Sequence, residues 1–168
     1  MMKTKKGIKT MFRPIRRQKR EIDTEIAKEL LAKSRRGVLA VNGDGGYPYA
    51  MPVNYLYDEE SGRIFFHGAR AGHKFESIQR DDKVCFTVYG NDKYEEGDWA
   101  PYVQSTIVFG RCHLIENQDE AIELVTKLAK KYYPDESLIA EEVEKYGQAV
   151  QMFEISIEHL SGKMIHEK

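Results

Sequence analysis

The sequence has few cysteines and no long apolar run. Its 168 residues include two cysteines, Cys85 and Cys112, which lie in separate apolar, strand-like runs rather than at the spacing of a metal site or a disulfide framework. No apolar stretch approaches the roughly 20 residues needed to cross a bilayer, and no signal-peptide pattern is present. We therefore expect a cytoplasmic protein with no metal site and no membrane span, whose cysteines are small buried apolar residues.

Acidic residues are missing from the first 20 positions, which carry nine lysines and arginines. Residues 21–168 hold 17 basic against 27 acidic side chains. We predict that residues 1–20 form a basic N-terminal arm and that residues 21–168 form a single domain with one core. Such an arm can neutralise nucleic-acid phosphates or fold over an acidic partner subunit. Because the arm lacks the interleaved aromatic residues of single-strand binders, we do not expect nucleic acid as the partner.

Turn signals divide the chain into short β-strands with helices around them. Apolar spacing after the candidate N-cap Asp23 predicts a helix over 24–34. One or two helical turns are expected over 73–79, and helices over 119–133 and 137–146. Strands are predicted at 38–41, 47–57, 63–68, 83–89, 102–115 and 151–158.

The order of these elements indicates the fold class. The first two strands connect through residues 42–46, which form a dense turn signal, and Gly110 in the long strand marks a bulge or a close approach. No regular βαβ alternation is present. The sequence therefore predicts an α+β fold, in which an antiparallel six-stranded, barrel-like sheet carries peripheral helices.

Residues 66–74 combine a strand end, small residues and a helix start. A strand that turns through Gly68, Ala69 and Gly72 into a helix leaves backbone N–H groups free at the positive end of the helix dipole. Lys74 in the first helical turn adds a full charge. The segment can hold a phosphate, or it can be an ordinary connection with a solvated lysine.

The strand at 47–57 contains two prolines, Pro48 and Pro52. Each proline removes a donor from the sheet, so this strand is expected at an edge or at a barrel seam, where its unpaired groups can meet a ligand. Asn54 offers donors and acceptors to a planar heterocycle, and Tyr55 offers a flat apolar face. Ordinary strand positions explain these two residues equally well.

An ordered series of short blocks over about residues 12–163 resembles the flavin-binding split-barrel proteins related to pyridoxamine 5′-phosphate oxidase. The likeness is greatest to the branch that includes the 5-nitroimidazole resistance (Nim) proteins. The blocks are Gly37-Val38-Leu39-Ala40, Gly46-Tyr47-Pro48-Tyr49, Pro52-Val53-Asn54-Tyr55, Phe66-His67-Gly68-Ala69, Gly72-His73-Lys74 and Lys83-Val84-Cys85-Phe86.

The resemblance implies a six-stranded split β-barrel and a homodimer with two FMN sites at the subunit interface. The residues implied to run along the flavin ring are Pro52, Val53, Asn54 and Tyr55, with His67, Gly68 and Ala69 on the neighbouring strand. The residues implied to hold the phosphate are Gly72, His73 and Lys74. Those implied to approach from the partner chain are Gln104 and Ser105, with Trp99 nearby.

One departure from the family bears on the substrate. Pyridoxamine 5′-phosphate oxidase closes its active site with arginine-rich C-terminal residues that grip the substrate's phosphate, and this sequence has no arginine after Arg111. The resemblance therefore implies an FMN-dependent oxidoreductase that passes electrons from NAD(P)H or another donor to a small, electron-poor acceptor such as a nitroaromatic. The alternative is a non-catalytic flavin- or haem-binding protein of the same fold.

Two histidines are candidates for the proton donor of such a reaction. His67, on the strand beside the implied flavin ring, is the preferred catalytic candidate, and His73 is the other. Both can equally serve as hydrogen-bond partners of the flavin or of its phosphate.

Overall fold

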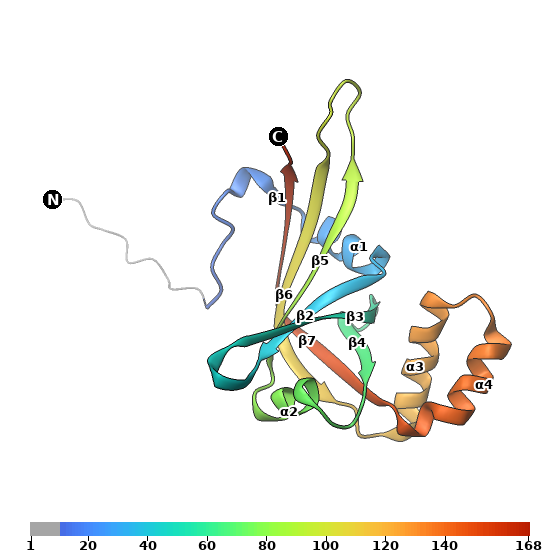
Figure 1. Cartoon of the computed structure of the whole chain (residues 1–168). Helices are drawn as coiled ribbons and strands as arrows, with labels where there is room; N and C mark the ends of the chain where they lie inside the picture. Colours follow the sequence, from blue (N-terminus) through green and yellow to red (C-terminus); the bar gives the residue numbers. More distant parts are fainter. Residues whose placement is uncertain (1–10) are drawn as a thin grey trace.

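Six antiparallel strands close into a ring in the computed structural model, which describes residues 11–168 (Figure 1). In ring order, the strand β7 is followed by β4, β3, β2, β5 and β6, and β6 pairs back with β7. Their bounds are β2 Arg36–Asn42, β3 Pro48–Asp58, β4 Arg63–Gly68, β5 Lys83–Lys93, β6 Tyr102–Leu114 and β7 Gln151–His166. The predicted α+β fold with a six-stranded barrel is confirmed. A short strand that was not predicted, β1 (Glu21–Ile22), adds to the outer edge of β7.

Within residues 11–168, four α-helices lie around the barrel, at positions close to those predicted. They are α1 Thr24–Lys33, α2 His73–Arg80, α3 Gln118–Tyr132 and α4 Glu136–Tyr146. The helices α3 and α4 form a hairpin beside β4 and β7 (Figure 1). Single 3-10 turns occur at Gln18–Arg20, Asp44–Gly46 and Gly147–Ala149. Among the described residues, no helix has the length and apolar character of a membrane span.

The barrel interior is filled by residues that alternate along the strands. Leu39, Phe86 and Val108 face inward and are almost inaccessible to solvent. The Phe66 ring stacks on Phe153 at a centroid distance of 4.9 Å, which joins β4 to β7. Each such side chain contributes about 1.5–3 kcal/mol through burial, so this core holds the strands that carry the site.

The final strand is longer than predicted. The sequence pattern ended it at residue 158, which is wrong, because β7 continues to His166 and pairs with β6 along its whole second half. The pairing shifts by one residue between Phe109–His159 and Gly110–Ile157, which confirms the bulge or close approach expected at Gly110. A Cβ at Gly110 would lie 2.3 Å from the Ser156 carbonyl oxygen, so only glycine fits there.

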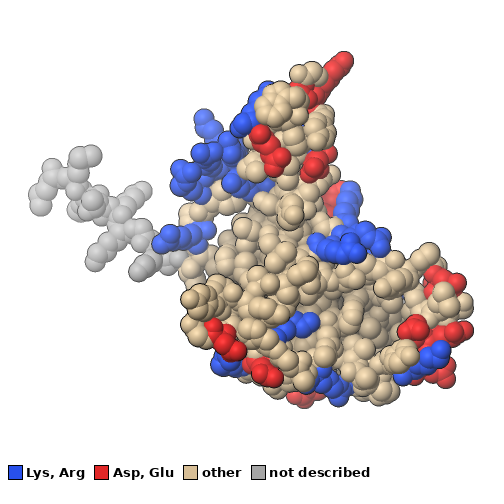
Figure 2. Space-filling view, viewed as in Figure 1, with Lys and Arg blue, Asp and Glu red and all other residues tan. Residues whose placement is uncertain are grey.

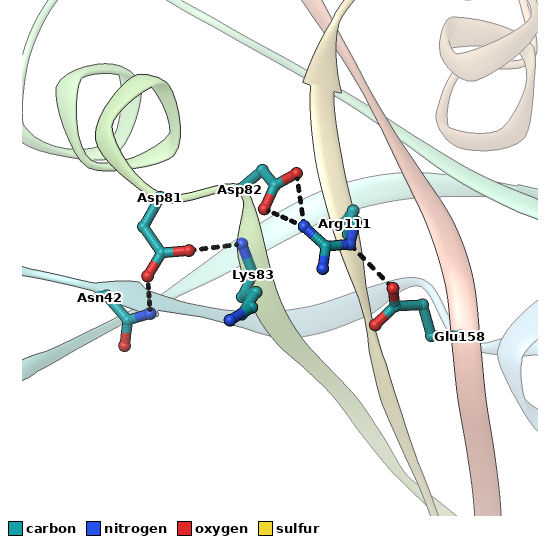
Figure 3. A network of polar contacts seen from close by, with 6 residues as sticks. All are labelled: Asn42, Asp81, Asp82, Lys83, Arg111 and Glu158. Atoms are coloured by element: carbon teal, nitrogen blue, oxygen red, sulfur yellow. Dashed lines mark hydrogen bonds and ion pairs between the residues drawn. The ribbon is translucent and has the colours of Figure 1, made fainter. Parts of the chain in front are cut away.

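A polar network lies beside this bulge on the outside of the barrel (Figure 3). The Arg111 guanidinium donates to both Asp82 carboxylate oxygens at 2.8 and 3.0 Å and to Glu158 at 2.8 Å. These hydrogen bonds raise the pKa of Arg111. Asp81 accepts from the Asn42 amide at 2.9 Å. The network therefore links the start of β5 with β2, β6 and β7 where the ring closes.

Part of the predicted basic arm lies outside the described residues, namely residues 1–10. In the remainder, the Phe12 ring stacks on Phe109 and His159 at centroid distances of 5.6 and 4.8 Å. This contact lays the start of the described chain against β6 and β7.

Candidate functional site

The sheet opens between β3 and β4, and some of the predicted ligand residues lie on the strands that flank the opening. The two strands pair only from Tyr55 opposite Phe66 to Asp58 opposite Arg63. Residues 48–54 of β3 pair on one side only, with β2, while the end of β4 pairs with β7 alone. The prediction that the strand with two prolines runs along an edge or seam is confirmed for this half of β3. Its free backbone groups face the opening.

The helix α2 begins directly after β4, at a glycine in the left-handed region. Gly72 is the N-cap residue with φ +98°, and no side chain caps the helix. The first N–H groups of an α-helix have no partner within the helix, so those of α2 remain available at the positive end of the dipole. This is the arrangement expected of an anion site.

The Lys74 side chain folds back over the end of β4 instead of extending into solvent. Its Nζ donates to the His67 carbonyl oxygen at 3.3 Å and lies 5.3 and 5.4 Å from the centroids of the Phe66 and Phe153 rings. Burial lowers the pKa of Lys74. Within residues 11–168, no carboxylate forms an ion pair with this ammonium group. A half-buried cation without a counter-ion favours binding of an anion.

The position of the Lys74 side chain depends on Gly68, the glycine that ends β4. A Cβ on Gly68 would lie 2.5 Å from the Lys74 Nζ and 3.0 Å from its Cε. Any larger residue would therefore displace the lysine. Gly68 thus provides the space in which the ammonium group rests.

Two residues that were not predicted as site residues contact His73: Asp44 in the turn between β2 and β3, and Tyr49 at the start of β3. The His73 ring stacks on Tyr49 at a centroid distance of 4.1 Å, and its Nε2 lies 3.6 Å from an Asp44 carboxylate oxygen. Asp44 also accepts from Arg80 at 3.0 Å. Arg80 follows His73 by seven residues, a spacing that places both on one helix face and could have indicated a shared partner.

His67 lies next to Lys74 and lines a cavity of about 630 Å³ between β4, α3 and α4. Desolvation and the nearby charge of Lys74 lower the pKa of His67. The imidazole is therefore neutral at pH 7, with one ring nitrogen able to donate and the other to accept.

Comparison with known proteins identifies the family of this chain. A family model described as pyridoxamine 5′-phosphate oxidase matches residues 23–164. The chain belongs to this family. No curated protein sequence matches it.

Several solved structures share the fold of this pyridoxamine 5′-phosphate oxidase family member. A candidate 5-nitroimidazole antibiotic resistance protein from Bacteroides thetaiotaomicron is 19% identical with a TM-score of 0.71, and the match covers 87% of each chain. A FAD-binding protein from Mesorhizobium loti is 22% identical with a TM-score of 0.60, over 87% of this chain and 97% of the other. A FAD and heme binding protein from Mycobacterium smegmatis is 18% identical with a TM-score of 0.68, over 87% and 72%.

Tyr55, implied by the family resemblance to lie along the flavin ring, has its side chain in the barrel core. The ring is fully buried and meets Phe86 edge-on at 4.8 Å, and the hydroxyl donates to the Leu31 carbonyl oxygen. The Tyr132 hydroxyl of α3 accepts a hydrogen bond from the Tyr55 backbone N–H at 2.8 Å and can donate to the Tyr55 carbonyl oxygen at 2.9 Å. The expectation of a flat face for a ligand is therefore wrong for this side chain. Pro52, Val53 and Asn54 keep partly or fully exposed positions along the free edge.

The residues expected from the partner chain lie at the other end of the barrel. Trp99 is exposed in the connection between β5 and β6, far from α2 in Figure 1. Gln104 is buried and its side chain accepts from the Asn91 amide at 2.7 Å, while Ser105 is half-exposed. One copy of the chain therefore does not bring these three residues to Lys74. Among the described residues, no cluster of side chains could hold a metal ion.

Proposed function

We propose that this protein is an FMN-dependent oxidoreductase that reduces small, electron-poor, nitroaromatic-like acceptors. The observation that carries the proposal is Lys74, a half-buried ammonium group without a carboxylate partner at the uncapped start of α2. A phosphate at this point would accept from the helix N–H groups and from Lys74. The free edge of β3 lies beside it, where backbone groups can meet a flat polar ring.

The chain's own residues would divide the work as follows. When bound, a flavin supplies the transfer of electrons between donor and acceptor. Lys74 and the α2 N–H groups would anchor its phosphate, and Asn54 would offer an amide to its ring. His67 would offer a ring N–H or a ring nitrogen acceptor next to the site, because its lowered pKa keeps the imidazole neutral near pH 7.

The proposal includes a homodimer, which is supported by an apolar outer face on the barrel. On adjacent strands β5 and β6, Cys85 pairs opposite Phe109 and Thr87 opposite Ile107, and all four side chains point away from the core. In Figure 2, side chains that are neither acidic nor basic cover most of the face that is drawn, and the acidic ones lie mainly toward its margins. A second copy packed on these residues of β5 and β6 would cover them and could bring Trp99 and Ser105 to the opening of its partner.

FMN titration of the cofactor-free protein, followed by flavin fluorescence, tests the anchor. Lys74→Met keeps the apolar stem and removes the charge, and we expect it to weaken FMN binding roughly 10- to 100-fold, because a charge-assisted hydrogen bond contributes about 1.5–3 kcal/mol. The matched control is Lys83→Met, which removes an exposed lysine on β5 and should bind FMN as the wild type does. Equal affinity of both variants, or a wild type that takes up no FMN, would contradict the proposal.

Turnover is tested separately from binding. Anaerobic mixing with NADH or NADPH should bleach the flavin absorbance, and addition of a nitroaromatic should restore it. A bound flavin that neither nucleotide bleaches would instead support a flavin-carrying protein without turnover. Release of the cofactor by heat, followed by chromatography, distinguishes FMN from FAD. The names of two of the similar structures refer to FAD binding. A Soret band in the absorbance spectrum would reveal haem.

A further inference from the structure

The cavity beside His67 has the size and walls of a small-molecule site. Its volume of about 630 Å³ lies within the roughly 300–1,000 Å³ of typical ligand pockets. Apolar side chains from both helices of the α3–α4 hairpin form its walls, among them Val125, Ala129 and Val143. The helices are thus held apart on this side instead of closing on each other.

Large apolar side chains around the cavity remain open to solvent. Tyr133, Leu138 and Tyr146 all line it, and they are 62%, 58% and 60% exposed. Exposed apolar residues that converge on one hollow differ from singly scattered ones, because together they offer a surface that gains free energy when covered. Two of them are aromatic and suit a flat apolar molecule.

The charges at this cavity have one sign. Asp135 and Glu142 line it, and no lysine or arginine of the described chain does. Asp135 accepts from the backbone N–H groups of Ser137 and Leu138, and hydrogen bonds in this turn lower its pKa. It is therefore ionised at neutral pH. The His67 imidazole, whose pKa is lowered by desolvation and by the charge of Lys74, adds no positive charge at pH 7.

We propose that this cavity is the acceptor site and that it selects flat, apolar molecules that are neutral or cationic, against anions. The role as acceptor site rests on the proposed function, whereas the selection by charge follows from the cavity alone. The His67 imidazole and the hydroxyls of Tyr133 and Tyr146 can hydrogen-bond a neutral ligand. A phosphate ester or a carboxylate would instead meet two carboxylates in a lining that holds no lysine or arginine of the described chain, and Lys74, the cation beside His67, is engaged by the flavin phosphate in the proposed function.

Three probes that share a nitrophenyl ring and carry a neutral, a cationic or an anionic group para to the nitro group test this selection: para-nitrobenzyl alcohol, para-nitrobenzylammonium and para-nitrobenzoate. Binding to the FMN-loaded protein is measured by calorimetry and by shifts of the α3 and α4 amide resonances. We expect the alcohol and the ammonium to bind, and the benzoate to bind at least about tenfold more weakly. Equal affinity for the alcohol and the benzoate, or no binding of any probe, overturns the proposal. The flavin absorbance of the same samples reports separately whether the cofactor is held.

Neighbouring glutamates on α4 provide a matched pair of variants. Glu142→Lys reverses a charge in the cavity lining, and Glu141→Lys makes the same change at an exposed position outside it. We expect Glu142→Lys to remove most of the tenfold discrimination against the benzoate and Glu141→Lys to retain it. If both variants change the discrimination equally, the effect is one of net charge and the cavity does not select the ligand.

Filling the cavity tests its location. Ala129→Phe places a ring inside it, and Ala140→Phe places one on the exposed surface of α4. The first variant should lose binding of the alcohol at least about tenfold while keeping its flavin, and the second should bind as the wild type does. Unchanged binding in folded Ala129→Phe overturns the assignment.

Discussion

Gly110 provides a direct test of how the barrel closes. In Gly110→Ala, the new methyl group would lie 2.3 Å from the Ser156 carbonyl oxygen and 2.9 Å from the Ile155 Cγ2. Because the nearest atom belongs to the backbone of β7, the strand itself has to move by several tenths of an ångström or more. Overpacking of this kind costs about 1–3 kcal/mol. For a domain of this size, each kcal/mol corresponds to about 2–4 °C in Tm, so we expect a loss of roughly 2–12 °C.

Calorimetric melting of two glycine variants checks this estimate. Gly147→Ala is the matched control, since Gly147 has helical angles of φ −55° and ψ −34° and its nearest contact from a Cβ would be 3.3 Å, to the Val143 Cγ1. It should melt within about 2 °C of the wild type or slightly higher, because alanine restricts the unfolded chain. If Gly110→Ala melts together with Gly147→Ala, the close approach of β6 and β7 described here is incorrect.

Three further changes have defined outcomes. Burial lowers the pKa of Lys131 from 10.5 to about 8, so the unfolded chain binds this proton more tightly than the folded chain. The free energy of unfolding should therefore rise between about pH 8 and 10.5. Urea titrations should show a smaller rise in Lys131→Met, and an equal rise would refute this cause. Tyr55→Phe leaves the Leu31 carbonyl without its buried donor and should lower the free energy of unfolding by about 0.5–1.5 kcal/mol in urea, whereas no change would mean that the carbonyl finds another partner. Ile107→Asp places a charge on the outer face of β6 and should give monomers in light scattering. The variant should bind FMN more weakly while its circular dichroism spectrum stays unchanged. A dimer that persists in this variant would mean that the interface lies elsewhere.

Local signals in the sequence predicted the elements of the fold well, whereas the closure of the ring depends on distant pairing. The turn at 42–46 and the apolar spacing in α3 lie within a few residues of each other and can be interpreted without the rest of the chain. The second half of β7 could not be predicted in this way, because His159 to Lys163 show little apolar alternation. Pairing with β6 keeps these residues in a strand, and the shift at Gly110 hides the register.

For the candidate site, too, local features could be predicted from the sequence, whereas contacts between distant residues could not. The glycine-rich start of α2 and the proline-containing edge of β3 are local features, and the structure brings them together as the sequence suggested. The position of the Tyr55 ring follows from strand alternation, which turns neighbouring side chains to opposite faces, so Asn54 and Tyr55 cannot serve one ligand equally. The contacts of Tyr132 with the Tyr55 backbone connect residues far apart in the chain, and no local pattern predicts them.

The place of β7 in the ring has a consequence for synthesis of the protein. Of the strands in the ring it leaves the ribosome after all the others, yet it supplies partners for β4, β6 and β1. Until it emerges, the nascent chain exposes unpaired edges on β4 and β6 together with the apolar interior between them. Closure of the ring therefore waits until β7 has been synthesised, and the nascent chain has most need of chaperones in this interval.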